Sequence, residues 1–228
     1  MPLKNFIKNK QKNKKHFVWN DIEVFIKDPI STTDFSIQDV LSEVGKLIPK
    51  QLLSNLDSIY VGQFDFLKDR EVQASYENSS IFVTNEQDDL EDMTDDLVHE
   101  IAHSVEEIRA EHIYSDGKLE REFIAKRKSL FSILSSEGHD MDLIKYLDVE
   151  YDYEFDQFLY QDVGYTALSI MTANLFYSPY AATSLREYFA NGFEAYYHLK
   201  EGAHLQRLSP ELFKKIYGLT EVSYDTEH

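Results

Sequence analysis

The predominant spacing of apolar residues changes from strand-like to helical near Thr94, and this change restricts the possible folds more than any other feature of the sequence. Before residue 90, short runs rich in Val, Ile and aromatic residues are typical of strands, and one stretch with helical spacing ends at Pro49. From Thr94 onward, apolar residues recur every three or four positions, which is typical of helices. Strands first and helices afterwards predict an α+β fold. The predicted strands are 17–26, 58–64 and 80–84, and the predicted helices are 34–48, 94–112, 118–134 and most of 165–217.

One further segment, 147–156, has a different pattern. Its apolar and acidic residues alternate strictly, as they do in a strand with one apolar and one acidic face. We therefore expect an additional strand within the mainly helical C-terminal part.

Size and composition are those of one well-packed domain. The chain has 228 residues, of which 43% are hydrophobic, and its 15 Phe and 15 Tyr outnumber its 8 Gly and 5 Pro. These proportions exclude wholesale disorder and fibrous repeats. No obvious linker divides the chain, so we expect a single domain over 17–228, preceded by a basic flexible tail over 1–16.

Charge is segregated between that tail and the rest of the chain. Six lysines lie between Lys4 and Lys15, whereas the whole chain carries a formal net charge of −18. Nucleic acid phosphates and anionic lipids would repel the acidic body. The tail is either a solvated segment or an arm that binds an acidic partner or nucleic acid. No apolar run follows the lysines and none is long enough to span a membrane, so we expect neither a Sec signal nor a membrane helix, and the compartment stays open.

The segment His99-Glu100-Ile101-Ala102-His103 matches the H-E-x-x-H pattern. Residues four apart on a helix project from the same side, so both imidazoles can bind one cation. Glu100 lies beside them and is placed to accept a proton from a metal-bound water. The chain has no cysteine, which leaves histidine and carboxylate as the strong ligands. The alternative is two surface histidines on an acidic helix.

The flanks of the motif favour a metal site. Thr94 can cap the start of the helix. A strand at 80–84 comes just before it, and zinc peptidases commonly bind substrate along an edge strand above such a helix. Glu106 and Glu107 follow closely enough for a carboxylate to orient an imidazole. The apolar stripe expected to be buried is Leu97, Ile101, Val105 and Ile108.

A zinc site of this kind needs a third protein ligand, and no other histidine follows at metzincin spacing. A carboxylate is therefore expected, and Glu187 offers one on a later helix. Ser184 and Glu187 also form a capping-box pattern, in which the glutamate would bond the Ser184 amide instead of a metal. If Thr183 is the cap, Glu187 is available as a ligand.

Two segments, Leu97–Glu107 and Tyr180–Ala190, carry a resemblance to a known family. Together they resemble the protease domain of anthrax lethal factor and the related Pro-Pro endopeptidases. In that family a tyrosine precedes the ligand glutamate by seven residues, as Tyr180 precedes Glu187 here.

The resemblance implies a zincin-like fold of the gluzincin type, in which His99, His103 and Glu187 bind Zn²⁺. It also implies that Glu100 is the general base. Tyr180 would donate its phenol hydrogen to the oxyanion of the tetrahedral intermediate.

The sequence also departs from the family. The 84 residues from His103 to Glu187 exceed the expected spacing and imply an insertion that includes 118–134 and the alternating segment 147–156. Asn191 occupies a position where the family tends to carry a second acid, and its amide oxygen can accept a hydrogen bond from an imidazole without charge. Tyr180 could also simply pack in the core.

These features predict a zinc-dependent endopeptidase that hydrolyses peptide bonds in a protein or peptide substrate. One alternative is a non-catalytic structural or virion-associated protein that retains a zincin fold, and another is a binding module that acts through Lys4–Lys15. Eleven acidic residues between Glu86 and Glu111, together with the acids of 147–156, further predict a preference for basic peptides.

Overall fold

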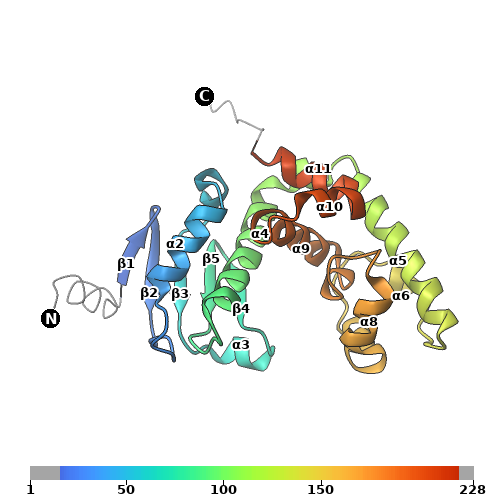
Figure 1. The fold of residues 1–228 in the computed structure, drawn as a ribbon, viewed down its shortest axis with the longest axis horizontal. Coiled ribbons are helices and arrows are strands. Elements are labelled where there is room, and N and C mark those ends of the chain that lie inside the picture. The colour runs from blue at the N-terminus through green and yellow to red at the C-terminus, as the bar shows by residue number, and fades with distance from the viewer. Residues whose placement is uncertain (1–15, 221–228) are drawn as a thin grey trace. The chain divides into compact units, whose positions relative to one another are not determined.

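The computed structural model describes residues 16–220, and its fold is α+β, with a five-stranded sheet in the first part of the chain and helices in the rest. Contacts group the chain into two compact units, Met1–Val105 and Glu106–His228. Figure 1 shows the elements of each unit. The Lys4–Lys15 tail lies outside the described residues, and the single domain over 17–228 stays a prediction.

The first unit contains the sheet. Its strands are β1 (His16–Trp19), β2 (Ile22–Ile26), β3 (Ser58–Val61), β4 (Ala74–Glu77) and β5 (Ser80–Val83). They lie in the order β1-β2-β3-β5-β4, in which β2, β3 and β5 are parallel and the two outer strands are antiparallel to their neighbours. The strands predicted at 58–64 and 80–84 are confirmed as β3 and β5, whereas β4 was not predicted.

The two faces of the sheet differ, because successive side chains of a strand point to opposite sides. Val24, Ile59 and Ile81 are paired in register, and each is at most 1% exposed. This face belongs to the core. The opposite face carries a row of stacked rings whose centroids are 4.7 to 5.0 Å apart. The row consists of His16, Phe25, Tyr60 and Phe82.

The single strand predicted over 17–26 is wrong, because the segment forms a hairpin of β1 and β2. Asn20 and Asp21 make the turn, with φ angles of 51° and 71°. Two successive residues with positive φ are typical of the tight hairpin turn that matches strand twist, and Asn and Asp tolerate this conformation. The sequence signal was the Asn-Asp pair between two apolar runs.

The expectation that 80–84 provides an edge strand is also wrong. The strand β5 lies between β3 and β4 and pairs with both, so β4 forms that edge of the sheet. A second tight turn at Asn78 and Ser79 joins β4 to β5. Since β4 is only four residues long and lacks a continuous apolar pattern, the sequence gives little sign of it.

The helices of the first unit begin with α2 (Ile37–Leu47), which confirms the helix predicted within 34–48. The N–H of Ser36 donates to Oδ2 of Asp39 over 2.9 Å, as in one half of a capping box. Pro49 follows the end of the helix, as predicted. Two short helices come next, η1 (Lys50–Leu53) and α3 (Asp65–Asp69).

The long helix α4 (Leu90–Tyr114) begins four residues before Thr94, so the prediction that Thr94 caps it is wrong. Asp89 caps it instead, since its Oδ1 accepts the N–H groups of Glu91 at 2.7 Å and Asp92 at 3.0 Å. The hydroxyl of Thr94 donates to the Leu90 carbonyl within the helix. The boundary between the two units falls inside α4, after Val105.

The predicted apolar stripe of α4 is buried over its first three positions. Leu97, Ile101 and Val105 are at most 1% exposed, but Ile108 is 41% exposed. Ile108 lies beyond the first unit, in whose core the other three are packed. The expectation that Ile108 is buried is therefore wrong.

The second unit is helical in the residues that the structure describes. The predicted helix 118–134 is confirmed as α5, and most of 165–217 is helical as predicted. Between residues 16 and 220, no helix has both the length and the apolar character needed to cross a membrane. The elements after α4 are α5 (Lys118–Ser136), α6 (Leu143–Leu147), α7 (Tyr153–Gln157), η2 (Phe158–Gly164), α8 (Tyr165–Thr172), η3 (Tyr180–Ala182), α9 (Leu185–Tyr197), α10 (Gly202–Leu208) and α11 (Pro210–Gly218).

The strand predicted over 147–156 is wrong. The segment runs from the end of α6 through a turn region into α7. Asp152 caps α7, because its Oδ1 accepts the N–H of Phe155 over 2.8 Å. Tyr153, which belonged to the predicted apolar face, is 69% exposed. Local bonds from aspartate side chains to the backbone thus replace the strand pairing that the alternation predicted.

The carboxylate of Glu122 on α5 binds the backbone at the start of α11. The carboxylate of Glu122 accepts the N–H groups of Glu211 at 2.8 Å and Leu212 at 3.1 Å, at the start of α11. It also accepts the hydroxyl of Tyr188 at 2.9 Å. A carboxylate at the N-terminus of a helix satisfies amides that have no partner within the helix.

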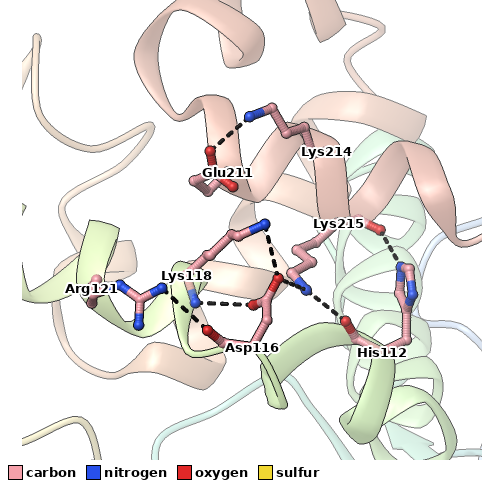
Figure 2. A network of polar contacts seen from close by, with 7 residues as sticks. All are labelled: His112, Asp116, Lys118, Arg121, Glu211, Lys214 and Lys215. Atoms are coloured by element: carbon pink, nitrogen blue, oxygen red, sulfur yellow. Dashed lines mark hydrogen bonds and ion pairs between the residues drawn. The ribbon is translucent and has the colours of Figure 1, made fainter.

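A second polar network joins the end of α4 to α5 and α11 (Figure 2). The ammonium of Lys215 donates to the carbonyl of His112 over 2.7 Å and lies 3.1 Å from Oδ2 of Asp116. Oδ1 of Asp116 accepts the N–H of Lys118 over 3.0 Å. The imidazole of His112 lies 3.3 Å from the Lys215 carbonyl, so this histidine belongs to a helix junction.

Lys126 of α5 is a buried cation, only 9% exposed, whose ammonium donates to the carbonyls of Leu175 and Leu208. Burial lowers the pKa of Lys126 from 10.5 to about 8. Between these two values the unfolded chain binds the proton more tightly than the folded chain. The contribution of Lys126 to stability should therefore rise with pH from about 8 to about 10.5.

Urea denaturation of the parent and Lys126→Met tests this prediction. The free energy of unfolding of the parent, relative to that of the variant, should increase by about 2–3 kcal/mol between about pH 7.5 and 10. Other groups that titrate in this range cancel in the difference. An equal difference at both pH values would show that Lys126 is not desolvated in the folded state.

Candidate metal centre

The two histidines of the H-E-x-x-H motif lie on adjacent turns of α4, and their Nε2 atoms are 3.2 Å apart. Their rings are nearly perpendicular, at 77°, with centroids 4.9 Å apart. A tetrahedral zinc ion with nitrogen ligands at about 2.0–2.1 Å holds two such atoms roughly 3.3 Å apart. The pair of imidazoles thus has the separation that a shared zinc ion requires.

The alternative of two surface histidines does not fit this part of the structure. His103 is 8% exposed, and His99 is half-buried. The same nitrogen separation also permits a hydrogen bond between the rings, in which one imidazole donates and the other accepts. Geometry within α4 is therefore compatible with a metal and with a direct contact between the rings.

Glu100, the predicted general base, is 8% exposed and lies next to His99 on α4. One turn earlier, Oδ2 of Asp96 accepts a hydrogen bond of 2.8 Å from the amide of Gln87. Burial raises the pKa of Asp96 to about 6, and the negative charges of Asp95 and Glu100 act in the same direction, while the bond from Gln87 opposes them. The start of the motif helix is thus strongly acidic on the side that Asp96 occupies.

An acidic hollow of about 230 Å³ lies at this end of α4 in the first unit. Five of the eleven acids between Glu86 and Glu111 line it, whereas the acids of 147–156 do not form the predicted strand face. The preference for basic peptides stays a prediction. The lining residues are Gln73, Glu86, Gln87, Asp88, Asp92, Asp95 and Asp96.

Glu187, the predicted third ligand, lies in the first turn of α9 in the second unit. Ser184 is the N-cap of α9, and its Oγ accepts the N–H of Glu187 over 3.1 Å. Thr183 is not the cap, and its hydroxyl donates to the Tyr180 carbonyl. This cap bond uses the backbone N–H of Glu187 and not its carboxylate. It therefore does not decide whether the carboxylate binds a metal.

The residue next to Glu187 contacts the motif helix within the second unit. Nε of Arg186 donates to Oε2 of Glu106 over 3.0 Å, and the Glu106 side chain is 7% exposed. Oε1 of Glu106 accepts the hydroxyl of Tyr114 over 2.5 Å. Glu106, predicted to orient an imidazole, is therefore engaged by Arg186 and Tyr114, and Glu107 is exposed. Arg186 directly precedes the predicted ligand, and this adjacency is the only signal in the sequence that could have pointed to it.

Tyr180, the predicted oxyanion donor, lies in the short helix η3 and is half-buried. Burial raises its pKa above the ordinary value, and the negative charge of Glu187 raises it further. The phenol therefore keeps its proton at neutral pH, which a hydrogen-bond donor requires.

Asn191, one turn after Glu187 on α9, is only 5% exposed. Its side-chain oxygen accepts a hydrogen bond from the hydroxyl of Ser178, and its amide nitrogen donates to the Glu187 carbonyl over 3.1 Å. The expectation that this oxygen could accept from an imidazole stays untested. The bonds that Asn191 makes fix the segment before Tyr180 to the first turns of α9.

Comparisons with protein-family models, with curated proteins and with solved structures found no match.

Proposed function

We propose that the chain is a zinc-dependent endopeptidase. The observation that carries the proposal is the 3.2 Å separation of the Nε2 atoms of His99 and His103 on a helix in which Glu100 directly follows His99 in the sequence. Two imidazoles with this spacing suit a zinc ion, and a glutamate in this position suits general-base catalysis.

We further propose that Glu187 is the third ligand, which would complete a set of two imidazoles and one carboxylate. Support comes from the second unit, where Arg186 binds Glu106 of the motif helix. Glu106 follows His103 by three residues on α4, and Arg186 directly precedes Glu187. The order of the ligands along the chain agrees with the gluzincin pattern, and the tyrosine seven residues before Glu187 agrees with the resemblance to the lethal factor-like family.

Each residue then has a distinct task in peptide hydrolysis. A zinc ion held by the three ligands would supply Lewis acidity and lower the pKa of a water molecule. Glu100 would accept the proton of the attacking water and pass it to the leaving amine. Tyr180 would donate a hydrogen bond to the carbonyl oxygen of the substrate as negative charge develops there.

Zinc stoichiometry and peptide cleavage test this function together. We expect one zinc ion per chain and zinc-dependent cleavage within a peptide library that contains acidic, basic and proline-rich sequences. Zinc binding without cleavage would favour a non-catalytic protein that retains the site. Failure to bind zinc would exclude the enzyme and leave the binding module that acts through Lys4–Lys15.

Replacing Tyr180 with Phe tests the oxyanion role. The variant should keep its zinc affinity and its KM, while kcat should fall about 100-fold, because the lost donor acts mainly in the transition state. Tyr177 is a suitable control, since it lies three residues earlier and its hydroxyl donates to Glu201. If Tyr180→Phe and Tyr177→Phe both have the same kcat as the parent, Tyr180 has a packing role and does not act as the oxyanion donor.

A further inference from the structure

We propose that Arg127 of α5 is a positioning residue for the proposed metal centre. It binds the segment 182–183, which lies between Tyr180 and Glu187, and so determines where these two side chains project. The effect of Arg127 on catalysis rests on the proposed function. The contacts of Arg127 with the segment 182–183 do not, and they all lie within the second unit.

Arg127 is 1% exposed and binds backbone carbonyls from two other segments. Its Nη1 donates to the carbonyls of Ala182 at 2.5 Å and Thr183 at 3.2 Å. Its Nη2 donates to the carbonyl of Lys145 in α6. The planar guanidinium can bind several acceptors at once in a fixed geometry, which a single ammonium cannot do equally well.

Aromatic rings hold the guanidinium in place. Its central carbon lies 4.0 Å from the ring centroid of Phe155, 5.3 Å from that of Phe123 and 5.9 Å from that of Tyr146. Burial lowers the pKa of Arg127 to about 10, which still leaves it charged at neutral pH. A buried charge is costly unless its hydrogen bonds are made, so the three carbonyls and the rings fix one position of the side chain.

The carbonyls that Arg127 binds depend on a partner from outside their own segment. Ala182 and Thr183 are at most 1% exposed. Ala182 is the last residue of η3, and Thr183 lies between it and the N-cap Ser184. Buried carbonyls must be hydrogen-bonded, and here the guanidinium supplies the donors. Without it, this segment would have to shift or admit water.

Movement of this segment would displace both Tyr180 and Glu187, the two proposed site residues on either side of it. Tyr180 lies two residues before Ala182, and Glu187 lies four residues after Thr183 in the first turn of α9. Arg127 belongs to the part of the chain that the family resemblance does not cover. The task that follows for α5 is to hold the segment that carries the proposed oxyanion donor and the proposed carboxylate ligand.

Lys126 provides a matched control, because it is a buried cation at the adjacent position of the same helix. It also binds two backbone carbonyls, but these belong to Leu175 and Leu208, outside 180–187. Lys126→Met and Arg127→Met thus each remove one buried cation and its carbonyl contacts from α5. Only the second removes contacts to the segment between Tyr180 and Glu187.

The experiment compares the parent, Arg127→Met, Arg127→Lys and Lys126→Met in the full chain. Hydrogen exchange of the peptides that cover 180–187 reports the segment directly, without reference to activity. Zinc affinity, measured by competition with a chelator, and kcat and KM on a cleaved peptide report the site. We expect Arg127→Met to speed exchange over 180–187 and to lower zinc affinity and kcat about 10- to 100-fold, the range seen when an outer contact of a metal ligand is lost. KM should change much less.

Arg127→Lys should restore part of the zinc affinity and kcat, because the ammonium can bind one or two of the carbonyls. Lys126→Met should leave exchange over 180–187, zinc affinity and kcat close to the parent values. If Arg127→Met does not fold, the test rests on Arg127→Lys. Its zinc affinity and kcat should then lie between the parent values and those expected for Arg127→Met.

Two results would overturn the inference. One is unchanged exchange over 180–187 in both Arg127 variants, and the other is equal losses of zinc affinity in Arg127→Met and Lys126→Met. A parent protein that binds no zinc would instead contradict the proposed function. In that case the exchange measurement still decides whether Arg127 positions the segment.

Discussion

Glu100→Gln should nearly abolish peptide cleavage while the fold and the bound zinc are retained. Glutamine has nearly the same size and shape as glutamate, but its neutral amide cannot accept the proton of the attacking water. Glu100 is only 8% exposed, so a residue of similar shape is needed to keep the packing of α4. General-base catalysis typically contributes between about 10² and 10⁴ in rate, and we expect a loss in kcat near the upper end.

The measurement is kcat on a cleaved peptide, with zinc content and thermal unfolding recorded on the same samples. Glu111→Gln is the matched control, because this substitution makes the same chemical change on the same helix at an exposed position. The control should cleave at the parent rate. Cleavage at the parent rate by Glu100→Gln itself would refute the assigned mechanism.

Glu187→Gln should weaken zinc binding by more than about 100-fold, because the loss of a direct ligand should exceed the effect of a lost outer contact. The stability of the zinc-free protein should change little. The Ser184 hydroxyl accepts the backbone N–H of Glu187, and the substitution leaves that bond in place.

Two further variants separate the ligand from the helix cap. Ser184→Ala removes the cap acceptor and should lower the free energy of unfolding by about 1 kcal/mol, while zinc affinity falls much less than in Glu187→Gln. Glu194→Gln makes the same chemical change two turns further along α9 and should leave zinc affinity unchanged. Equal zinc retention by Glu187→Gln and the parent after dialysis would exclude Glu187 as a ligand.

The sequence was sufficient where the relevant interactions are local. Apolar spacing located α2, α5 and most of α4, because an amphipathic helix repeats its pattern over several turns. It failed where a few polar residues redirect the chain. Asn20 and Asp21 break the predicted strand into a hairpin, and Asp152 caps a helix inside an alternating pattern that is typical of a strand.

The candidate site divides in the same way. That His99 and His103 share one side of a helix follows from the sequence, because four-residue spacing within one helix sets their separation. Only the tertiary structure shows that Arg186 binds Glu106 and that Arg127 binds carbonyls 55 and 56 residues further along the chain. These contacts join residues distant in the sequence, and no periodicity encodes them. They form because buried carbonyls and buried charges each need a partner, and the packing of the helices decides which partner is within reach.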